Sequence, residues 1–466
     1  MNKGTYRCFL VSVLVLFSLM FLIGCNAPKD QLAAFNSHFE ASDYEAAILF
    51  AEKKISKHKD PARDDLLWIL QAATAGRCSK DYQKSTEYFD RSEDILKYYD
   101  ERSNLCDAFG SALVNENVIP YRGQEYDGIM VNTYKALNFM AEGNMDLARI
   151  EFNRALDRQR RARENFAKEI AKLKNELDKK QRWEKYDVKA NVENPQTQVL
   201  LTEKYPSLYE FEAYPDFINP FTTYLAGVFF NLVDDHSKAV DLLKESYGMV
   251  QDNPYMAEDL SVTENILDGQ GKLENTVWLI FENGLGPIKT EFRLDIPLFI
   301  VTRDVRYVGI ALPKLDYRNR AYQHLRIETN DKKSYTTAIV SEMDRVIQTE
   351  FGKDFEAILA RAIVSAASKA TAQYFLEQQE DKLASLGAIA TAAYSFATNA
   401  ADVRIWTSLP KEFQVARFPK PTDGKLRISP PAAAPLIIDI PPCNNVIVYV
   451  KIISAGAEPV YDVMTF

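Results

Sequence analysis

The sequence predicts an α+β protein that is mainly α, with paired helices first and short strands toward the C-terminus. In residues 31–268, apolar residues recur every three or four positions with small residues among them, which is typical of packed amphipathic helices. From residue 275 onward, short alternating apolar runs are separated by glycine and proline, which is typical of strands joined by turns. We therefore expect a helical domain over residues 31–268 and an α+β domain over residues 275–466.

The composition fits a globular protein of two or three domains. The chain has 466 residues, of which 47% are hydrophobic and 26% charged. A net charge of -9 argues against nucleic acid as the main partner. The cysteines and histidines show no metal-binding spacing, and nucleotide-binding and hydrolase motifs are absent from the sequence. We therefore expect no cofactor, no metal and no enzymatic activity.

The N-terminus has the pattern of a bacterial lipoprotein signal. Lys3 and Arg7 precede the apolar run Phe9–Ile23, which is short for a membrane-spanning helix. The run leads into Leu-Ile-Gly-Cys at residues 22–25, which matches the lipobox. The alternative is an uncleaved membrane anchor with a chance cysteine.

The resemblance to lipoprotein signals implies how the mature chain begins. Residues 1–24 would be removed as a signal peptide, and Cys25 would become the first residue and carry lipid. Residues 25–30 would then form a very short lipidated tether. Asn26 stands where an aspartate usually retains lipoproteins in the inner membrane, so we expect the outer membrane, with the protein facing the periplasm.

Residues 131–159 form the clearest unit, two amphipathic helices joined by a turn at Gly143. Small and aromatic side chains recur where the helices should cross; they are Ala136, Phe139, Ala148, Phe152 and Ala155. The pattern resembles a tetratricopeptide repeat (TPR), whose second helix carries A-x3-F. One such pair cannot bury its own apolar face, so the pattern predicts neighbouring pairs.

Three further helix pairs are expected, two within residues 31–100 and one within residues 220–251. Each carries a small residue near the start of its second helix, at Ala47, Ser85 and Ala239. The separations of these positions along the chain exceed the usual TPR period of ~34 residues, so we expect insertions between the units.

The main insertion is predicted to be a long helix over residues 144–187. Neither proline nor glycine occurs from Asn144 to Asn194, and an apolar stripe continues along a heavily charged segment. The stripe could lie against the rest of the protein, or the helix could project as an arm that binds a partner. The stripe covers few heptads, which favours packing against the protein.

The C-terminal domain is predicted to combine strands with helices. Val277–Phe281 and Lys289–Leu298 flank a glycine-rich turn and predict a hairpin. Tyr335–Gln379 reads as a helix, and the uncharged segment Ala384–Ala401 is too polar for a membrane span, so we expect it to complete a buried helix hairpin. Short strands over residues 413–466 predict a small antiparallel β-sandwich, which the strands from residue 277 onward should join or flank.

Asp402, Arg404 and Trp406 stand out at the boundary between the predicted helix hairpin and the sandwich. They could form a recognition site, or an ion pair and an aromatic plug that join the two parts. We favour the structural interpretation because ion-pair networks are common in architecture as well as in active sites.

Three cysteines would remain in the mature chain beside the lipidated one. The periplasm is oxidising, so nearby thiols tend to pair there. Cys78 and Cys106 lie one helix apart, and we expect any intramolecular disulfide to join them, with Cys443 as a buried free thiol. Three separately buried cysteines are the alternative.

Several segments together resemble a family of Gram-negative TPR-containing outer-membrane lipoproteins. They are the lipobox, Tyr-Lys-Ala-Leu-Asn-Phe at residues 134–139, Glu-Asn-Gly-Leu-Gly-Pro-Ile-Lys-Thr-Glu at residues 282–291, and Ala-Asp-Val-Arg-Ile-Trp-Thr-Ser-Leu-Pro at residues 401–410. The resemblance implies an envelope location and a scaffold role, and it carries over no catalytic residue.

We therefore expect a non-catalytic lipoprotein that binds another envelope protein through its TPR surface. The alternative is an envelope enzyme, or a glycan-binding or ligand-binding protein, with its site in the C-terminal domain. A cleft with two inward-facing carboxylates less than ~10 Å apart would favour that alternative.

Overall fold

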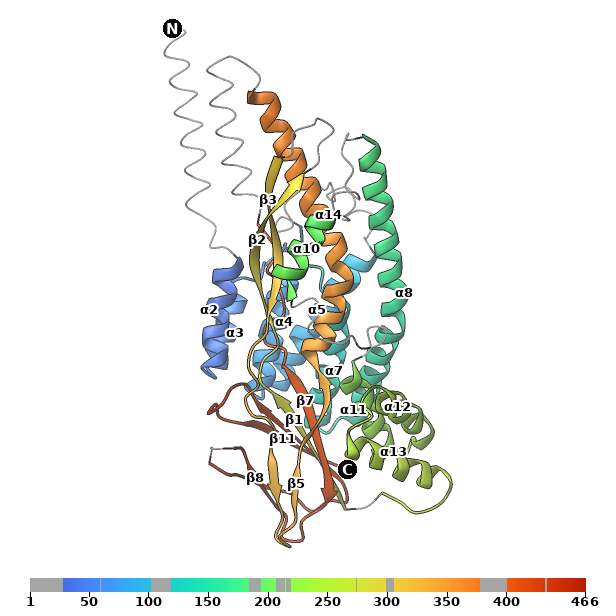
Figure 1. The fold of residues 1–466 in the computed structure, drawn as a ribbon. Helices are drawn as coiled ribbons and strands as arrows, with labels where there is room; N and C mark the ends of the chain where they lie inside the picture. The colour runs from blue at the N-terminus through green and yellow to red at the C-terminus, as the bar shows by residue number, and fades with distance from the viewer. Residues whose placement is uncertain are drawn as a thin grey trace.

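The computed structural model describes residues 28–58, 60–101, 119–183, 194–206, 214, 219–273, 275–298, 306–377, 400–431 and 434–466. Its fold is α+β, with helices in the N-terminal part and several sheets in the C-terminal part, as the sequence predicts (Figure 1). Cys25, Cys106 and nearly all of the predicted second helix at 384–401 lie outside the described residues.

The helices before the first strand follow each other in closely spaced pairs. They are α2 (Pro28–Glu40), α3 (Tyr44–Glu52), α4 (Asp65–Cys78), α5 (Tyr82–Glu101), α7 (Glu125–Ala141), α8 (Met145–Trp183), α10 (Pro195–Lys204), α11 (Pro220–Leu232), α12 (His236–Met249) and α13 (Pro254–Leu267). The predicted long helix is therefore present as α8, which packs against α7 and also contacts α11 and α14 (Met343–Glu377).

Four of the connections between paired helices share one turn geometry. In each, a single residue adopts positive φ; these residues are Ser42, Lys80, Gly143 and Asp234. The amide of the next residue donates to the carbonyl oxygen five positions earlier, which is the bond that closes a helix C-terminus when the chain turns through the left-handed region. Four residues into the second helix lie the fully buried small residues Ala47, Ser85, Ala148 and Ala239. The small-residue positions predicted from sequence are thus structurally equivalent.

Three helices start at an Asn-Pro pair. The side chains of Asn194, Asn219 and Asn253 each accept a hydrogen bond from the amide two residues further on. The following proline occupies the first helical turn, where its missing N–H costs nothing. These pairs fix the starts of α10, α11 and α13 from local chemistry alone.

The strands form three sheets. Their bounds are β1 (Thr276–Asn283), β2 (Ile288–Leu298), β3 (Arg306–Asp316), β4 (Arg326–Glu328), β5 (Ser334–Thr336), β6 (Ala338–Glu342), β7 (Glu412–Pro419), β8 (Lys425–Ser429), β9 (Leu436–Asp439), β10 (Val446–Ile452) and β11 (Val460–Thr465). One sheet has the order β11-β10-β1-β7-β6, another the order β5-β4-β8-β9, and β2 pairs with β3 alone.

The predicted hairpin of Val277–Phe281 with Lys289–Leu298 is wrong. β1 pairs in parallel with β10 and antiparallel with β7, whereas β2 pairs with β3. Every residue of β1 is buried, because its two faces contribute to two different hydrophobic clusters. A strand that is apolar on both faces belongs inside a sheet. Within residues 413–466, β8 pairs with β9 and β10 pairs with β11, both antiparallel; the parallel pair of the five-stranded sheet is that of β1 with β10.

The predicted helix also starts too early. Residues from Tyr335 onward form β5 and β6 first, and α14 begins only at Met343. The β-branched residues of Thr336–Val340 suit an extended conformation, and β6 gains backbone hydrogen bonds from β7. Tertiary pairing therefore outweighs the helical spacing of this stretch.

One hydrophobic core runs through both predicted domains. Buried residues of the helices and Trp278, Ile280, Phe413 and Trp406 belong to the same cluster. A second cluster lies between the five-stranded and the four-stranded sheets. Figure 1 shows α8, α14 and the β2–β3 pair running in one direction, away from those two sheets. Within the described residues, none of the helices has the length and apolar character needed to cross a membrane.

Candidate functional site

In three of the four helix pairs the two helices differ in burial according to their place in the pair, whereas α2 of the first pair buries only Leu32, Phe35 and Phe39. Along α4, α7 and α11, here called the first helices, almost every residue is buried. Along α5, α8 and α12, the second helices, buried residues recur only every three or four positions. The first helices are therefore enclosed on all sides, and the second helices keep an exposed face.

The 401–410 segment covers α4. Gln71 donates to Thr407 at 2.8 Å and accepts from the hydroxyl of Ser408 at 2.7 Å. The indole of Trp406 donates to the hydroxyl of Thr74 at 2.9 Å. Gln71 and Thr74 lie three residues apart and so on one side of the helix. That side of α4 is bound by the protein's own chain.

The structural interpretation of Asp402, Arg404 and Trp406 is supported by their contacts. The Arg404 guanidinium is 2% exposed and forms ion pairs of 2.8 Å with both Asp402 and Asp64. Trp406 packs between Phe89 and Tyr134, with 6.0 Å between ring centroids in each case. The three residues thus join the 401–410 segment to α5, α7 and the start of α4. The sequence instead predicted a joint between a helix hairpin and the sandwich.

The five-stranded sheet covers the same helices through a buried polar network. Glu282 in β1 accepts hydrogen bonds from Lys451 at 2.5 Å and from Tyr134 of α7 at 3.0 Å. Arg77 of α4 donates to Asn138 and forms an ion pair of 3.3 Å with Asp462. All these side chains are buried or nearly so, and they fix the sheet to the first helices.

The first helix of the fourth pair, α11, is also covered by strands of the C-terminal part. The rings of Phe221 in α11 and Phe413 in β7 stack with 3.6 Å between centroids. Ser341 of β6 donates to the side chain of Asn219, which caps α11. The C-terminal part of the chain therefore contacts every first helix.

The predicted contact residues of the central pair lie at the interface of α7 with α8. Four of them, Ala136, Ala148, Phe152 and Ala155, are fully buried. Phe139 is half-buried at the edge of the pair. Phe152 also packs on Phe229 of α11, with 4.9 Å between ring centroids, and so links two successive pairs.

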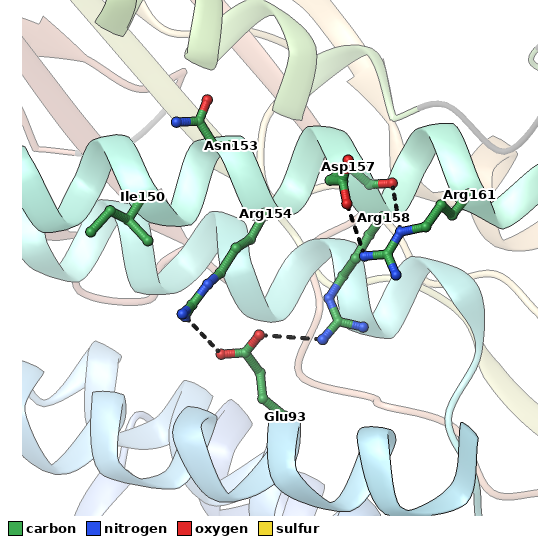
Figure 2. Close-up of a pocket in the computed structure, with 7 residues that line it drawn as sticks. All are labelled: Glu93, Ile150, Asn153, Arg154, Asp157, Arg158 and Arg161. Atoms are coloured by element: carbon green, nitrogen blue, oxygen red, sulfur yellow. Dashed lines mark hydrogen bonds and ion pairs between the residues drawn. The ribbon is translucent and has the colours of Figure 1, made fainter. Parts of the chain in front are cut away.

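An open groove of about 500 Å³ lies between α5 and α8, on the exposed side of the second helices (Figure 2). It is lined by Glu93 from α5 and by Ile150, Asn153, Arg154, Asp157, Arg158 and Arg161 from α8. Figure 2 shows Glu93 pointing from α5 toward the arginines above it. Arg154 and Arg158 reach this carboxylate at 3.6 and 3.2 Å.

A buried lysine lies beneath the groove. Lys135 of α7 is 2% exposed and contacts three carboxylates, Asp90 at 2.8 Å, Glu93 at 2.5 Å and Glu151 at 3.0 Å. Burial disfavours the charged form of Glu93, but hydrogen bonds from Lys135 and Asn132 and the nearby positive charges outweigh it and lower the Glu93 pKa to about 2. Glu93 is therefore a fixed negative charge.

A glycine lets one arginine lie against the floor of the groove. A Cβ on Gly128 of α7 would lie 3.0 Å from the Arg158 guanidinium. With that space open, Arg158 Nε donates to Asn132 at 2.7 Å while its Nη2 contacts Glu93. Arg158 is thus held in one position before any ligand arrives.

The groove continues into an exposed apolar patch. Leu147 and Ile150 are 39% and 44% exposed and lie three residues apart on α8. Arg154 and Arg161 are 54% and 60% exposed. The surface of α8 therefore offers apolar contacts near its start and guanidinium groups further along.

The groove is poorly suited to acid–base chemistry. Its two carboxylates, Glu93 and Asp157, are both ion-paired with arginines. A general acid needs a raised pKa, whereas that of Glu93 is lowered. Among the described residues, no three His, Cys, Asp or Glu side chains are grouped so that they could hold a metal ion. The groove instead presents guanidinium groups and the apolar side chain of Ile150.

Sequence reasoning missed this site. The spacing of Arg154, Arg158 and Arg161 along a long helix was a visible signal, since these positions share one helix face. Its partner Glu93 comes from a different helix pair, and no local pattern connects the two.

The predicted covalent sites are only partly described. Cys78 is buried and has no disulfide partner among the described residues, and burial raises the pKa of its thiol to about 11. Because Cys106 lies outside the described residues, the disulfide stays a prediction, as does lipidation of Cys25. Cys443 is free and half-buried, so it is less enclosed than predicted.

Comparisons with known proteins do not add a relative. Neither the protein-family models, nor the curated proteins, nor the solved structures contain a match to this chain. The family resemblance therefore stays a prediction.

Proposed function

We propose that this protein is a non-catalytic scaffold of the bacterial envelope, an outer-membrane lipoprotein anchored through Cys25 and facing the periplasm, that binds another envelope protein. Its helix pairs act as TPR-like repeats, and its C-terminal β-sandwich braces them. The binding surface is the groove between α5 and α8.

The observation that carries this proposal is the difference between the two sides of the helical pairs. TPR-like arrays bind peptides on surfaces formed by their stacked helices. Here the first helices are covered by the 401–410 segment and the five-stranded sheet. The second helices leave a groove of about 500 Å³ open between Glu93 and the arginines of α8. A partner therefore meets the second helices.

The enzymatic alternative has less support. The carboxylates of the groove are ion-paired, and the buried carboxylates of the C-terminal part hold elements together. Glu282, Asp344 and Glu412, for example, each pair with a cation inside the protein. Such groups stabilise the fold and are not presented to a substrate.

Anchoring is tested by Cys25→Ser in the full-length chain. We expect the variant to lack lipid and to appear as a soluble protein or as an unprocessed precursor, because the thiol that accepts the lipid is gone. Metabolic lipid labelling and membrane fractionation are the measurements. Normal lipidation of the variant would show that the lipobox assignment is wrong.

Partner binding is tested by photo-crosslinking in cells. A photo-reactive amino acid placed at Ile150 in the groove should give a crosslinked product with another protein. The same amino acid at Ile437, which is 57% exposed on β9, provides a control at a distant apolar surface residue. A product at Ile437 and none at Ile150 would place the partner elsewhere; no product at any tested surface position would contradict the scaffold role.

A further inference from the structure

We propose that the groove between α5 and α8 binds an acidic amphipathic helix of the partner. Carboxylates of that helix pair with Arg154, Arg158 and Arg161, and its apolar residues pack on Leu147 and Ile150. This inference rests on the proposed scaffold function and specifies the chemistry of the partner.

The residues that would receive the helix form one stripe. Leu147, Ile150, Arg154, Arg158 and Arg161 are separated by three or four positions, which places them on one face of α8. The stripe is about 21 Å long at 1.5 Å per residue. A partner helix of about four turns lying along α8 covers it, and ridges of one helix fit grooves of the other at such contacts.

The charges of the groove favour carboxylates. Its lining holds three arginines and two carboxylates in a chain whose net charge is -9. Of those two, Glu93 is shared with the buried Lys135, and Asp157 is shared by Arg160 and Arg161. Arginine presents a planar fork that carboxylates bind through two parallel hydrogen bonds. An arriving carboxylate can therefore join arginines that still have donors to offer.

Positioning of the arginines adds to this preference. Arg158 is fixed by Asn132 and by the space above Gly128, and Arg154 is held by Glu151 at 2.8 Å. Side chains that are already ordered lose less conformational entropy when a ligand binds. The site is thus preorganised for a partner with charges at fixed spacing.

A helix fits better than an anionic membrane surface. The carboxylates of Glu93 and Asp157 alternate with the arginines, so a continuous sheet of phosphates would face repulsion as well as attraction. A helix with carboxylates at intervals of three or four residues can place each one beside an arginine. The apolar pair Leu147 and Ile150 is confined to one end of the stripe, so the partner helix needs apolar residues only where it meets that end.

The test replaces Asn153, a neutral residue lining the groove, with a photo-reactive amino acid in the full-length lipidated protein in cells. The crosslinked segment is then identified by mass spectrometry. We expect a protein segment with a helical apolar stripe and an excess of Asp and Glu. Charge reversal by Arg154→Glu with Arg161→Glu should lower the yield at least tenfold.

The matched control reverses two lysines of similar exposure that also have carboxylate neighbours, Lys333→Glu in the turn before β5 with Lys425→Glu in β8. Its yield should equal that of the unmodified protein, and thermal unfolding should show that both variants stay folded. A basic, neutral or extended crosslinked segment, a phospholipid adduct, or an unchanged yield after arginine reversal would overturn the inference. A protein adduct of the wrong chemistry leaves the scaffold role intact, whereas the absence of protein adducts at every surface position contradicts both.

Discussion

The two sides of the helical pairs satisfy their polar groups in different ways. On the first helices, Gln71 and Thr74 are buried and bonded to the 401–410 segment. On the second helices, Arg154 and Arg161 are more than half exposed; Arg154 pairs with Glu93 across the open groove, and Arg161 pairs with Asp157 of its own helix. A repeat architecture can thus use its stacked first helices to hold its own C-terminal part. The surface available for a partner is then the other side.

The energetic roles of the two sides should differ accordingly. Burying large aromatic residues and satisfying buried hydrogen bonds dominate stability, whereas exposed ion pairs contribute about 0–1 kcal/mol each. We therefore expect substitutions at the 401–410 segment to change stability, and substitutions of the exposed groove residues Ile150, Arg154 and Arg161 to change binding.

The largest effect is expected for Trp406→Ala. Trp406 is 1% exposed and packs on Phe89 and Tyr134, so its loss leaves a cavity where the segment meets α4 and α7. We expect the free energy of unfolding to fall by about 3–5 kcal/mol. Urea denaturation provides the measurement. Ile150→Ala in the groove should cost less than about 1 kcal/mol. Equal losses for the two variants would contradict the difference in stability between the two sides of the helical pairs.

Within α8, burial should separate two substitutions that introduce the same residue. Ala148→Asp places a carboxylate at a fully buried contact with α7, and we expect a loss of about 2–4 kcal/mol. Asn153→Asp, five residues on, faces the groove and should leave stability nearly unchanged. Thermal unfolding of both variants is the check. Similar melting temperatures would mean that Ala148 is not a packing position.

Much of the fold was predictable because its signals are local. The short strands over residues 413–466 are present as predicted, since prolines and glycines mark their ends and short alternating runs fill them. The small residues Ala47, Ser85, Ala148 and Ala239 identified equivalent positions in four helix pairs, because each follows the same turn.

The features that the sequence does not predict depend on contacts between distant segments of the chain. The sequence predicts β1 as one strand of a hairpin, but its strand partners β7 and β10 lie more than a hundred residues away in sequence. Nothing near Gln71 indicates that residues 407 and 408 would bond to it. The groove was missed for the same reason, since Glu93 and Arg158 come from different helix pairs.

The dependence of stability on pH should have opposite signs on the two sides. Burial raises the pKa of Asp127, in α7, to about 6, above the ordinary value of an aspartate. Its protonated form is therefore favoured by folding, and this contribution is complete below about pH 4 and is lost as pH rises through 6. Between pH 4 and pH 7, the free energy of unfolding should therefore decline by on the order of 2 kcal/mol less in Asp127→Asn than in the unmodified protein.

Glu93 in the groove should behave in the opposite way. Its pKa is lowered to about 2, so its charge stabilises the folded state above about pH 4.5 and that contribution is lost as pH falls toward 2. Glu93→Gln should therefore reduce stability at pH 7 and flatten the decline on the acid side. Urea titrations at several pH values measure both slopes. A variant that changes neither slope would show that its carboxyl group has no altered pKa.

The smallest change in stability is expected for Gly128→Ala. This variant tests whether the position of Arg158 serves the groove or the fold. Alanine in place of a helical glycine favours the helix by about 0.5–1 kcal/mol. The new methyl group would lie 3.0 Å from the Arg158 guanidinium and 3.4 Å from its Cδ, so the side chain must move away from Asn132. These effects oppose each other, and we expect the free energy of unfolding to change by less than about 1 kcal/mol.

Crosslinking from the groove should nevertheless fall several-fold in Gly128→Ala, because Arg158 no longer holds its position. Gly248→Ala in α12, where a methyl group meets nothing within 4 Å, keeps the helix effect and should leave crosslinking unchanged. If Gly128→Ala lowers stability strongly but leaves the yield intact, Arg158 serves the fold and not the groove.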